Sequence, residues 1–441
     1  MSLFFMSIQQ ALRQTAELNP ASFERFSQLI DPLWIEEALR LTGTISLRRR
    51  RLPAERIVWL VVGMALFKNE PIWLIVQQLG LSDGQGLAPA PSAVVQARQR
   101  LGEAPLEALF EQLAQAWLAT EPPACARFHG LRSFAVDGVV WSMPDTPENR
   151  EAFSSGKNQH GVSNWPQARG VCLMDTYSHL IRAARFGSFA VGELSFAREL
   201  AQAVGDHSLT IFDRAYYSAT FLLDWQRQGI ERHWLMRAKS TLRHDIVKTF
   251  GPGDWLVRLP VSPQARRQQP QLPEYWQARL IERRVDGKPR RYLSSLCDPH
   301  RYPADQVAAH YRERWEIELG YREIKQGLQD GGLLRSKLPE LARQELWGTL
   351  LAYNLIRQEM HLMAEELEIP PQRLSFQWLA IAGALRYCPT QTPATIPQRL
   401  AELRIQARHF VLPPRRERHY PRVVKPKPIK YPKKKNASQL N

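Results

Sequence analysis

The sequence predicts a mixed α/β protein in which a sheet with helices on its faces lies between two helical segments. Three stretches of the chain indicate this class. Residues 1–125 have helical apolar periodicity, residues 131–239 alternate short β-branched runs with helical patterns, and residues 340–412 are helical again. At 441 residues the chain exceeds what one hydrophobic core usually serves, so several structural units are expected.

The N-terminal unit, residues 1–125, is expected to consist of helices. One helix follows Pro53, a second begins at Pro71, and a third is predicted to begin with a Ser92 cap and to end at Gly102. The third helix is expected to expose four polar or basic side chains: Gln96, Arg98, Gln99 and Arg100. Three short helices with a basic last member resemble a helix-turn-helix DNA-binding unit. A solvated face on an ordinary helical bundle is the alternative, and the pattern does not decide between them.

The central unit, residues 126–339, begins with the strand LRSFAVDGVVW and continues in the order β-β-β-α-β-α-β, which predicts a mixed sheet. Residues 240–300 are β-rich and form a predicted insertion with a turn at Asp286-Gly287. Residues 340–412 form a helical C-terminal region. The proline-interrupted residues 413–441 are predicted to be an extended basic tail.

The charge of the chain indicates a partner rich in phosphates. Fifty-nine basic side chains face 43 acidic ones, a net charge of +16. A membrane surface would also attract this charge, but the longest apolar run, residues 57–67, is too short to span a bilayer. The first residues lack the pattern of a signal peptide. The scattered cysteines form no CxxC pair and predict neither a zinc site nor disulfides. A reducing bacterial cytosol is therefore expected. Any metal would need oxygen ligands.

One segment rich in charged residues, YRERWEIELGYREIKQ, has a polar face beside its apolar face. On a helical wheel, Tyr311, Arg314, Glu318 and Lys325 fall within an arc of about 60°. The other glutamates of the segment point elsewhere: Glu313, Glu316 and Glu323. Taken alone, Arg314 and Glu318 could form a simple surface ion pair.

Two further acids favour a metal site over a surface ion pair. Asp137 lies inside the apolar strand FAVDGVVW, and Asp213 ends the apolar strand LTIFD. A buried carboxylate is normally paired, neutralised or metal-bound. Together with Glu318, these two aspartates form a hard-oxygen set suited to Mg²⁺ or Mn²⁺. Glu193, which follows Gly192 at a predicted helix start, is interpreted only as a favourable helix-terminal charge.

The spacing Tyr311-x2-Arg314-x3-Glu318-x6-Lys325, after two strand aspartates, resembles the Tyr-Arg-Glu-Lys signature of the insertion-sequence-four family of bacterial DDE transposases. The resemblance extends over nearly the whole chain, through segments such as RRRRLP, PSAVVQARQRLG, QELWG and YPRVVK. It implies an RNase H-like catalytic core with a β-rich insertion. It also implies a catalytic and metal-binding triad of Asp137, Asp213 and Glu318.

The resemblance further implies that Tyr311, Arg314 and Lys325 contact DNA phosphates near the transposon end. Relatives that form a hairpin intermediate stack a flipped base on an aromatic ring. Trp315 could have this role or be a core tryptophan, so the stacking residue is left unassigned. The second YRE, at Tyr321 to Glu323, is interpreted as coincidence.

The function implied is that of an insertion-sequence transposase that binds terminal inverted repeats, cleaves DNA and transfers the 3′-hydroxyl to target DNA. Cleavage would use Mg²⁺, for which Mn²⁺ substitutes. It could proceed with or without a hairpin intermediate. The partners of the protein would be the transposon ends, the target DNA and a second copy of the chain in a synaptic complex, in a bacterial cytoplasm beside the nucleoid and not at a membrane. Two alternatives stay open: an RNase H-like nuclease or resolvase without strand transfer, and a non-catalytic DNA-binding derivative.

Overall fold

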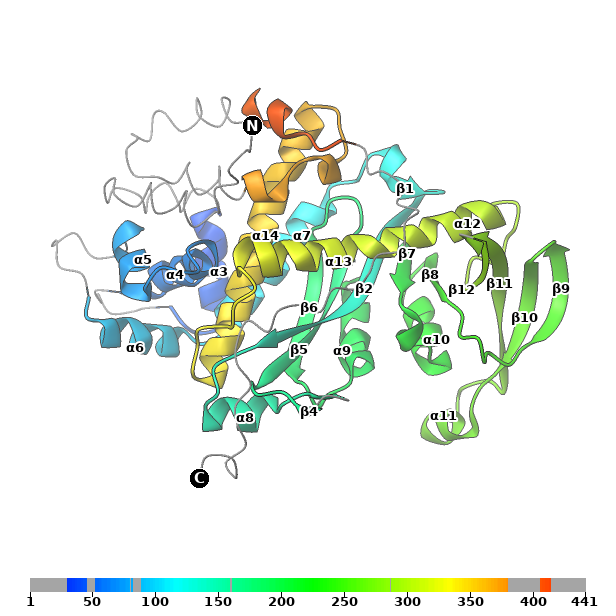
Figure 1. Cartoon of the computed structure of the whole chain (residues 1–441), viewed down its shortest axis with the longest axis horizontal. Coiled ribbons are helices and arrows are strands. Elements are labelled where there is room, and N and C mark those ends of the chain that lie inside the picture. The colour runs from blue at the N-terminus through cyan, green and yellow to red at the C-terminus, as the bar shows by residue number, and fades with distance from the viewer. Residues whose placement is uncertain are drawn as a thin grey trace.

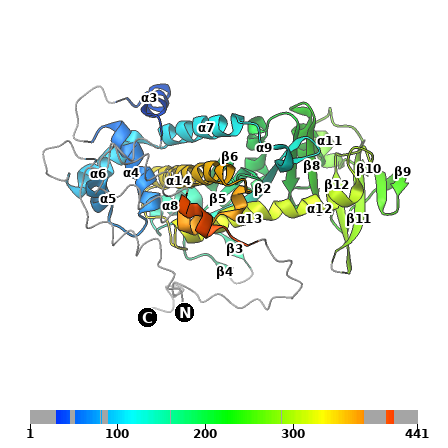
Figure 2. The ribbon, with the colours of Figure 1, turned by 90° about the horizontal axis from the view of Figure 1, so that it is seen from above.

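The computed structural model describes residues 30–45, 52–79, 81, 89–158, 161–285, 287–379 and 405–413. The helical N-terminal residues lie at one end of the molecule and the β-rich insertion at the other, with the main sheet between them (Figures 1 and 2). The predicted basic tail falls almost entirely outside the described residues. Within the described part of the chain, no helix is both long and apolar enough to cross a membrane.

A ten-stranded mixed sheet forms the centre of the protein, in the order β6-β5-β2-β7-β8-β12-β11-β10-β9, with β1 paired to β2. The strands β2, β7 and β8 are parallel neighbours, and the other pairs are antiparallel. The strands are β1 (Arg127–Phe128), β2 (Leu131–Ser142), β5 (Gln167–Asp175), β6 (Ile181–Ser188), β7 (Ser208–Phe212), β8 (Arg232–Arg237), β9 (Asp245–Gly251), β10 (Asp254–Pro260), β11 (Tyr275–Val285) and β12 (Lys288–Ser294). A separate two-stranded sheet pairs β3 (Lys157–Asn158) with β4 (Gly161–Val162).

The predicted order β-β-β-α-β-α-β is confirmed. Its members are β2, β5, β6, α9 (Glu193–Leu200), β7, α10 (Ala219–Arg227) and β8. The helices α9 and α10 bury apolar side chains such as Phe196 and Trp225 against one face of this sheet. Side chains along β2 alternate between the two faces of the sheet. Phe134 and Val136 face α9 and α10, whereas Ala135 and Val139 belong to the cluster on the opposite face.

The β-rich insertion continues the same sheet. Its strands β9 to β12, with the short helix α11 (Pro263–Gln268), join the core where β12 pairs antiparallel with β8. The strand β11 ends at Val285 and β12 begins at Lys288, as the predicted turn requires. Gly287 in this turn has φ +73°, a conformation that favours glycine.

Helices also cover the opposite face of the core sheet: α7 (Ala104–Ala119), α8 (Pro147–Phe153), α12 (Ala304–His310), α13 (Trp315–Arg322) and α14 (Pro339–Glu366). The N-terminal helices pack on α7 and α14 and not on the sheet: α3 (Pro32–Leu41), α4 (Ala54–Leu66), α5 (Ile72–Gln78) and α6 (Pro91–Leu101). The helices α4 and α14 pack so closely that a Cβ added to Gly348 would lie 2.6 Å from Cγ1 of Val61. One hydrophobic cluster therefore joins residues of α4, α7, α13 and α14 to the sheet.

The structure corrects two predictions about α6. Pro91 is its first residue and Ala90 its N-cap, so Ser92 is not the cap. Arg98 is only 2% exposed, although exposure was predicted. Its Nε donates to Gln344 at 2.9 Å and one terminal nitrogen donates to Ser336 at 3.1 Å, so it binds α6 to the C-terminal helix and cannot contact DNA. Gln96, Gln99 and Arg100 are exposed as predicted.

Candidate active site

Asp137 and Asp213 occupy matching positions on neighbouring parallel strands. The register of β2 and β7 pairs Val136 with Phe212, and each aspartate is the next residue of its strand or strand end. Adjacent strands are about 4.8 Å apart, so the two backbones are close at this level of the sheet. Asp213 is the N-cap residue of the short helix η4 (Arg214–Tyr216), although its side chain makes no capping hydrogen bond there. At this point β7 ends while β2 continues.

Glu318 comes from a helix that crosses the sheet (Figure 1). The chain is helical from Ala304 to Leu328, but its hydrogen bonding changes from α12 to the 3₁₀ segment Tyr311–Arg314, then to α13, and then to a π-helical turn at Glu323–Leu328. The prediction of one regular α-helix is therefore wrong in detail. Lys325, half-buried in the π-helical turn, does not have the wheel position that was calculated for it.

Arg314 joins two of the predicted site carboxylates. Its Nη1 donates to Oδ2 of Asp137 at 3.2 Å, and its Nη2 donates to Oε1 of Glu318 at 2.5 Å. The Arg314 side chain is 11% exposed, whereas that of Glu318 is 33% exposed and so remains open to solvent. The Arg314–Glu318 ion pair is thus not an isolated surface contact, because Arg314 also binds Asp137.

The surroundings of Asp137 are largely apolar. Burial raises the pKa of Asp137 to about 6, although the Gly138 N–H and the Arg314 guanidinium oppose this shift and the nearby Glu318 and Glu193 add to it. Its neighbour across the sheet is Cys172 on β5, and burial raises the pKa of that thiol to about 12. Burial therefore favours the neutral thiol form of Cys172.

Tyr311 lies close to the predicted triad. It is 9% exposed, and its ring centroid is 5.3 Å from that of Tyr292. Burial raises the pKa of Tyr311 to about 12, with Arg314 lowering it and Asp213 raising it. The neutral phenol is therefore near both Asp213 and Arg314 and is available as a hydrogen-bonding group.

The donor set suits a divalent ion, but the carboxylates are not yet gathered around one. Among the side chains that the structure describes, no three Asp, Glu, His or Cys residues lie close enough together to hold a metal. Instead, the Arg314 guanidinium neutralises Asp137 and Glu318. Carboxylate oxygens are ligands that Mg²⁺ and Mn²⁺ favour, so the residue types fit these ions once Arg314 has another anionic partner.

Glu316 and Glu323 point away from the site, as predicted, into a buried charged network. Nε2 of His179 lies 2.7 Å from Glu316, and Nδ1 of His179 lies 2.6 Å from Arg357. Arg357 also forms an ion pair with Glu323, to which Tyr353 donates at 3.1 Å. The network fixes both α13 and the π-helical turn to α14. Sequence reasoning missed it because its members lie far apart in the chain.

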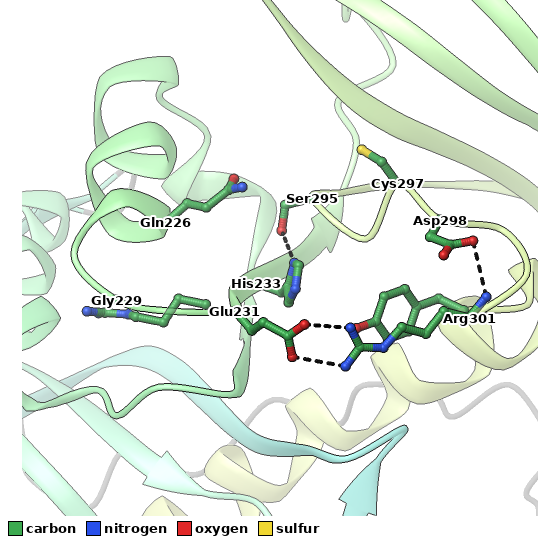
Figure 3. Close-up of a pocket in the computed structure, with 10 residues that line it drawn as sticks. Gln226, Gly229, Glu231, His233, Ser295, Cys297, Asp298 and Arg301 are labelled. Carbon is green, nitrogen blue, oxygen red and sulfur yellow. Dashed lines mark hydrogen bonds and ion pairs between the residues drawn. The ribbon is translucent and has the colours of Figure 1, made fainter.

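A cavity of about 440 Å³ lies elsewhere, at the start of β8 (Figure 3). Its wall includes Arg232, His233, Cys297 and the pair Glu231–Arg301, in which both guanidinium ends bind the carboxylate, at 2.6 and 2.9 Å. Because β7 and β8 are parallel, Arg232 aligns with the beginning of β7 and not with its end, where Asp213 lies. The cavity is therefore at the other end of the parallel strands from Asp213.

A mixed sheet with a β-rich insertion, two aspartates in register on parallel strands and a helix glutamate joined to one of them by Arg314 are typical of DDE phosphoryl-transfer enzymes. Residues 129–355 match the family model "Transposase DDE domain", and residues 20–111 match "Insertion element 4 transposase N-terminal". The chain belongs to the DDE transposases of insertion sequences, which are metal-dependent enzymes.

Curated relatives agree with this family. The transposase InsG for insertion sequence element IS4 from Escherichia coli K12 is 42% identical over 443 residues, which cover 98% of this chain and 99% of InsG. The protein InsZ of the same strain is 36% identical over 54% of this chain and 81% of its own length. A piggyBac transposase synaptic complex with hairpin DNA has a TM-score of 0.46 at 11% identity, covering 89% of this chain and 85% of that one.

Proposed function

We propose that this transposase cleaves DNA at the ends of its element and joins the 3′-hydroxyl to target DNA. The observation that supports it best is the convergence of Asp137, Arg314 and Glu318, with Asp213 in register on the adjacent parallel strand. The strand order around them, three strands followed by α9, β7, α10 and β8, supports an RNase H-like core.

Asp137, Asp213 and Glu318 would hold Mg²⁺, for which Mn²⁺ substitutes. Bound divalent ions in such a site activate a water or a 3′-hydroxyl and stabilise the leaving oxygen. Arg314 is the residue that must move first. A DNA phosphate offers its guanidinium a charge-assisted partner in place of the carboxylates. Tyr311, Arg314 and Lys325 would thereby position the cleaved strand while the carboxylates become available.

The rest of the chain would bind and arrange the DNA. The unit of residues 1–125 recognises the terminal repeats, the basic tail of residues 413–441 attracts DNA through its charge, and two copies of the chain bring the two ends together. The protein works on DNA in the cytoplasm beside the nucleoid. Trp315 is 55% exposed, so the core position considered for it is wrong, and its ring is free of the core to stack on a base if a hairpin forms.

The test uses labelled duplexes with the ends of the DNA segment that encodes this chain, together with Mg²⁺ and a target plasmid. We expect nicked ends and joined products from the unchanged protein. Asp137→Asn and Glu318→Gln should abolish nicking and retain end binding, whereas Glu365→Gln, at an exposed acid on α14, should change neither.

Three outcomes would contradict the proposal. Cleavage without joined products would indicate a nuclease or resolvase. End binding without any cleavage in Mg²⁺ or Mn²⁺ would indicate a non-catalytic derivative. Unchanged nicking in the Asp137→Asn and Glu318→Gln variants would show that the triad is wrongly assigned.

A further inference from the structure

A fourth carboxylate, that of Glu193, reaches the strand of Asp137 from the other face of the sheet. A Cβ added to Gly138 would lie 2.3 Å from Cδ of Glu193, and 2.5 and 2.6 Å from its two oxygens. Real Cβ atoms do not approach other atoms so closely. Glu193 can therefore occupy this position only because the residue after Asp137 has no side chain.

A tyrosine of η4 and an arginine of β5 lie next to the Glu193 carboxylate. The hydroxyl of Tyr216 donates to its Oε2 at 3.3 Å, and Nε of Arg169 on β5 lies 4.0 Å from its Oε1. Tyr216 belongs to the short helix whose N-cap residue is Asp213. Glu193 is thus connected to the backbone next to Asp137 and to the turn that begins at Asp213.

The simpler interpretations of Glu193 do not explain this position. As a helix-terminal charge it would be expected to satisfy the first N–H groups of α9, but its carboxylate lies instead on β2. As an ion-pair partner of Arg169 it is too distant for a hydrogen bond, because the nitrogen and oxygen are 4.0 Å apart. The Glu193 side chain is also 37% exposed, so it remains accessible from solvent.

The edge of the sheet explains how groups from both faces can meet. Pairing between β2 and β7 ends at Val136 and Phe212, so β2 has no partner on that side at Asp137 and Gly138. Glu318 and Arg314 approach from the face of α13, and Glu193 approaches from the face of α9. An ion held at this open edge would therefore be within reach of carboxylates from both faces.

We propose that Glu193 is a fourth carboxylate of the metal site, in which it would bind a divalent ion together with the strand aspartates. This inference rests on the proposed function of Asp137, Asp213 and Glu318. It assigns Gly138 a specific role, since the absence of a side chain there admits Glu193. It assigns Tyr216 the role of a positioning residue that orients the carboxylate.

Four variants of the full chain and a direct measurement of metal binding test this inference. Glu193→Gln removes the charge, and Gly138→Ala displaces the carboxylate, which can move because it is the end of a flexible side chain. Glu199→Gln is the matched control, because Glu199 lies on the same helix and pairs with Arg185 on the surface. Asp137→Asn tests the underlying site. Because Arg314 holds two of the carboxylates until a phosphate replaces them, Mn²⁺ binding is measured calorimetrically on each protein bound to a duplex of the element end. The duplex alone is the blank, and the melting temperatures of the proteins are compared first.

We expect Glu193→Gln and Gly138→Ala each to weaken Mn²⁺ binding by about tenfold or more. Glu199→Gln should bind Mn²⁺ as the unchanged protein does. If Asp137→Asn weakens Mn²⁺ binding while Glu193→Gln and Gly138→Ala do not, Glu193 is only structural and the inference is overturned. If Asp137→Asn also has no effect, the proposed triad itself fails.

Discussion

The hydroxyl of Tyr321 donates a 2.7 Å hydrogen bond to the backbone carbonyl oxygen of Asp137. Tyr321 is 8% exposed, and burial raises its pKa well above the ordinary value, so it remains a neutral donor. This bond fixes α13 to β2 at the level of the candidate site. The glutamate of the second YRE, Glu323, points away from the site, as the sequence predicted. Its tyrosine has a structural role that the sequence did not indicate, because it positions the helix.

Replacing Tyr321 by Phe should loosen this connection without unfolding the protein. Loss of the donor leaves the Asp137 carbonyl oxygen unsatisfied, which costs about 1–3 kcal/mol. We expect lower stability in urea unfolding and slower end cleavage at saturating Mg²⁺. Tyr275→Phe is the control, because Tyr275 is 44% exposed in the insertion. A cleavage rate equal to that of the unchanged protein would show that the bond has no positioning role.

Arg314→Met should make the folded protein depend more on divalent ions. Without the guanidinium, the carboxylates of Asp137 and Glu318 repel each other until a cation replaces it. The melting temperature of the variant should fall in chelator. On addition of Mg²⁺ it should rise by more than the melting temperature of the unchanged protein does. Each kcal/mol of added stability corresponds to a rise of about 2–4 °C. Cleavage should be slow even with Mg²⁺. An equal Mg²⁺-dependent rise in both proteins would argue against this role of Arg314.

Arg357→Met should destabilise the protein strongly. Arg357 is 1% exposed and pairs with Glu323, so its loss leaves a partly buried carboxylate without its cation, at a cost of at most about 3–5 kcal/mol. Arg322→Met, at an exposed position on α13, is the matched control. Adding Glu323→Gln to Arg357→Met should restore part of the free energy of unfolding. If the double variant is no more stable than Arg357→Met, the ion pair is not the cause.

Acid should destabilise the contact between α12 and the sheet. Burial, together with the nearby His129, lowers the pKa of His310 from 6.5 to about 4. Nε2 of His310 lies 2.7 Å from Oγ of Ser133, and its ring stacks on Phe128 at 4.2 Å. The unfolded chain binds the proton more readily, so stability is complete above pH 6.5 and falls towards pH 4.

The loss should reach up to about 3 kcal/mol, from the difference between the two pKa values. Urea unfolding between pH 7 and 4 measures it, and His310→Gln should flatten that part of the profile. His207→Gln is the control, because His207 is exposed and lies 3.2 Å from Glu231 on the surface. A profile that stays equally steep in His310→Gln would assign the acid sensitivity to other groups.

Two arginines of α6 should behave in opposite ways. Arg98→Met should reduce the free energy of unfolding, because the buried side chain of Gln344 and the hydroxyl of Ser336 lose a donor. Arg100→Ala, at an exposed position, should leave stability within about 0.5 kcal/mol and reduce the salt slope of DNA-end binding by about one. An unchanged salt slope in Arg100→Ala would support the alternative, a solvated face on a helical bundle.

The core strand order could be predicted because apolar alternation and turn residues are local signals. The pairing of Arg314 with Glu318 could also be predicted, because residues four apart meet on any helical turn. The π-helical turn at Lys325 could not, since it depends on packing against α14. Arg98 was misjudged because its partners, Gln344 and Ser336, belong to a distant part of the chain.

By itself, the sequence determined the identity of the acids, the segments that contain them and the family they indicate. Only the tertiary structure decided which groups meet: the register that aligns Asp137 with Asp213, the guanidinium of Arg314 between two carboxylates, and the approach of Glu193 to Gly138. The physical reason is the range of the interactions. Periodicity reflects hydrogen bonds and burial among near neighbours, whereas register and pairing depend on contacts between segments that are distant in the chain.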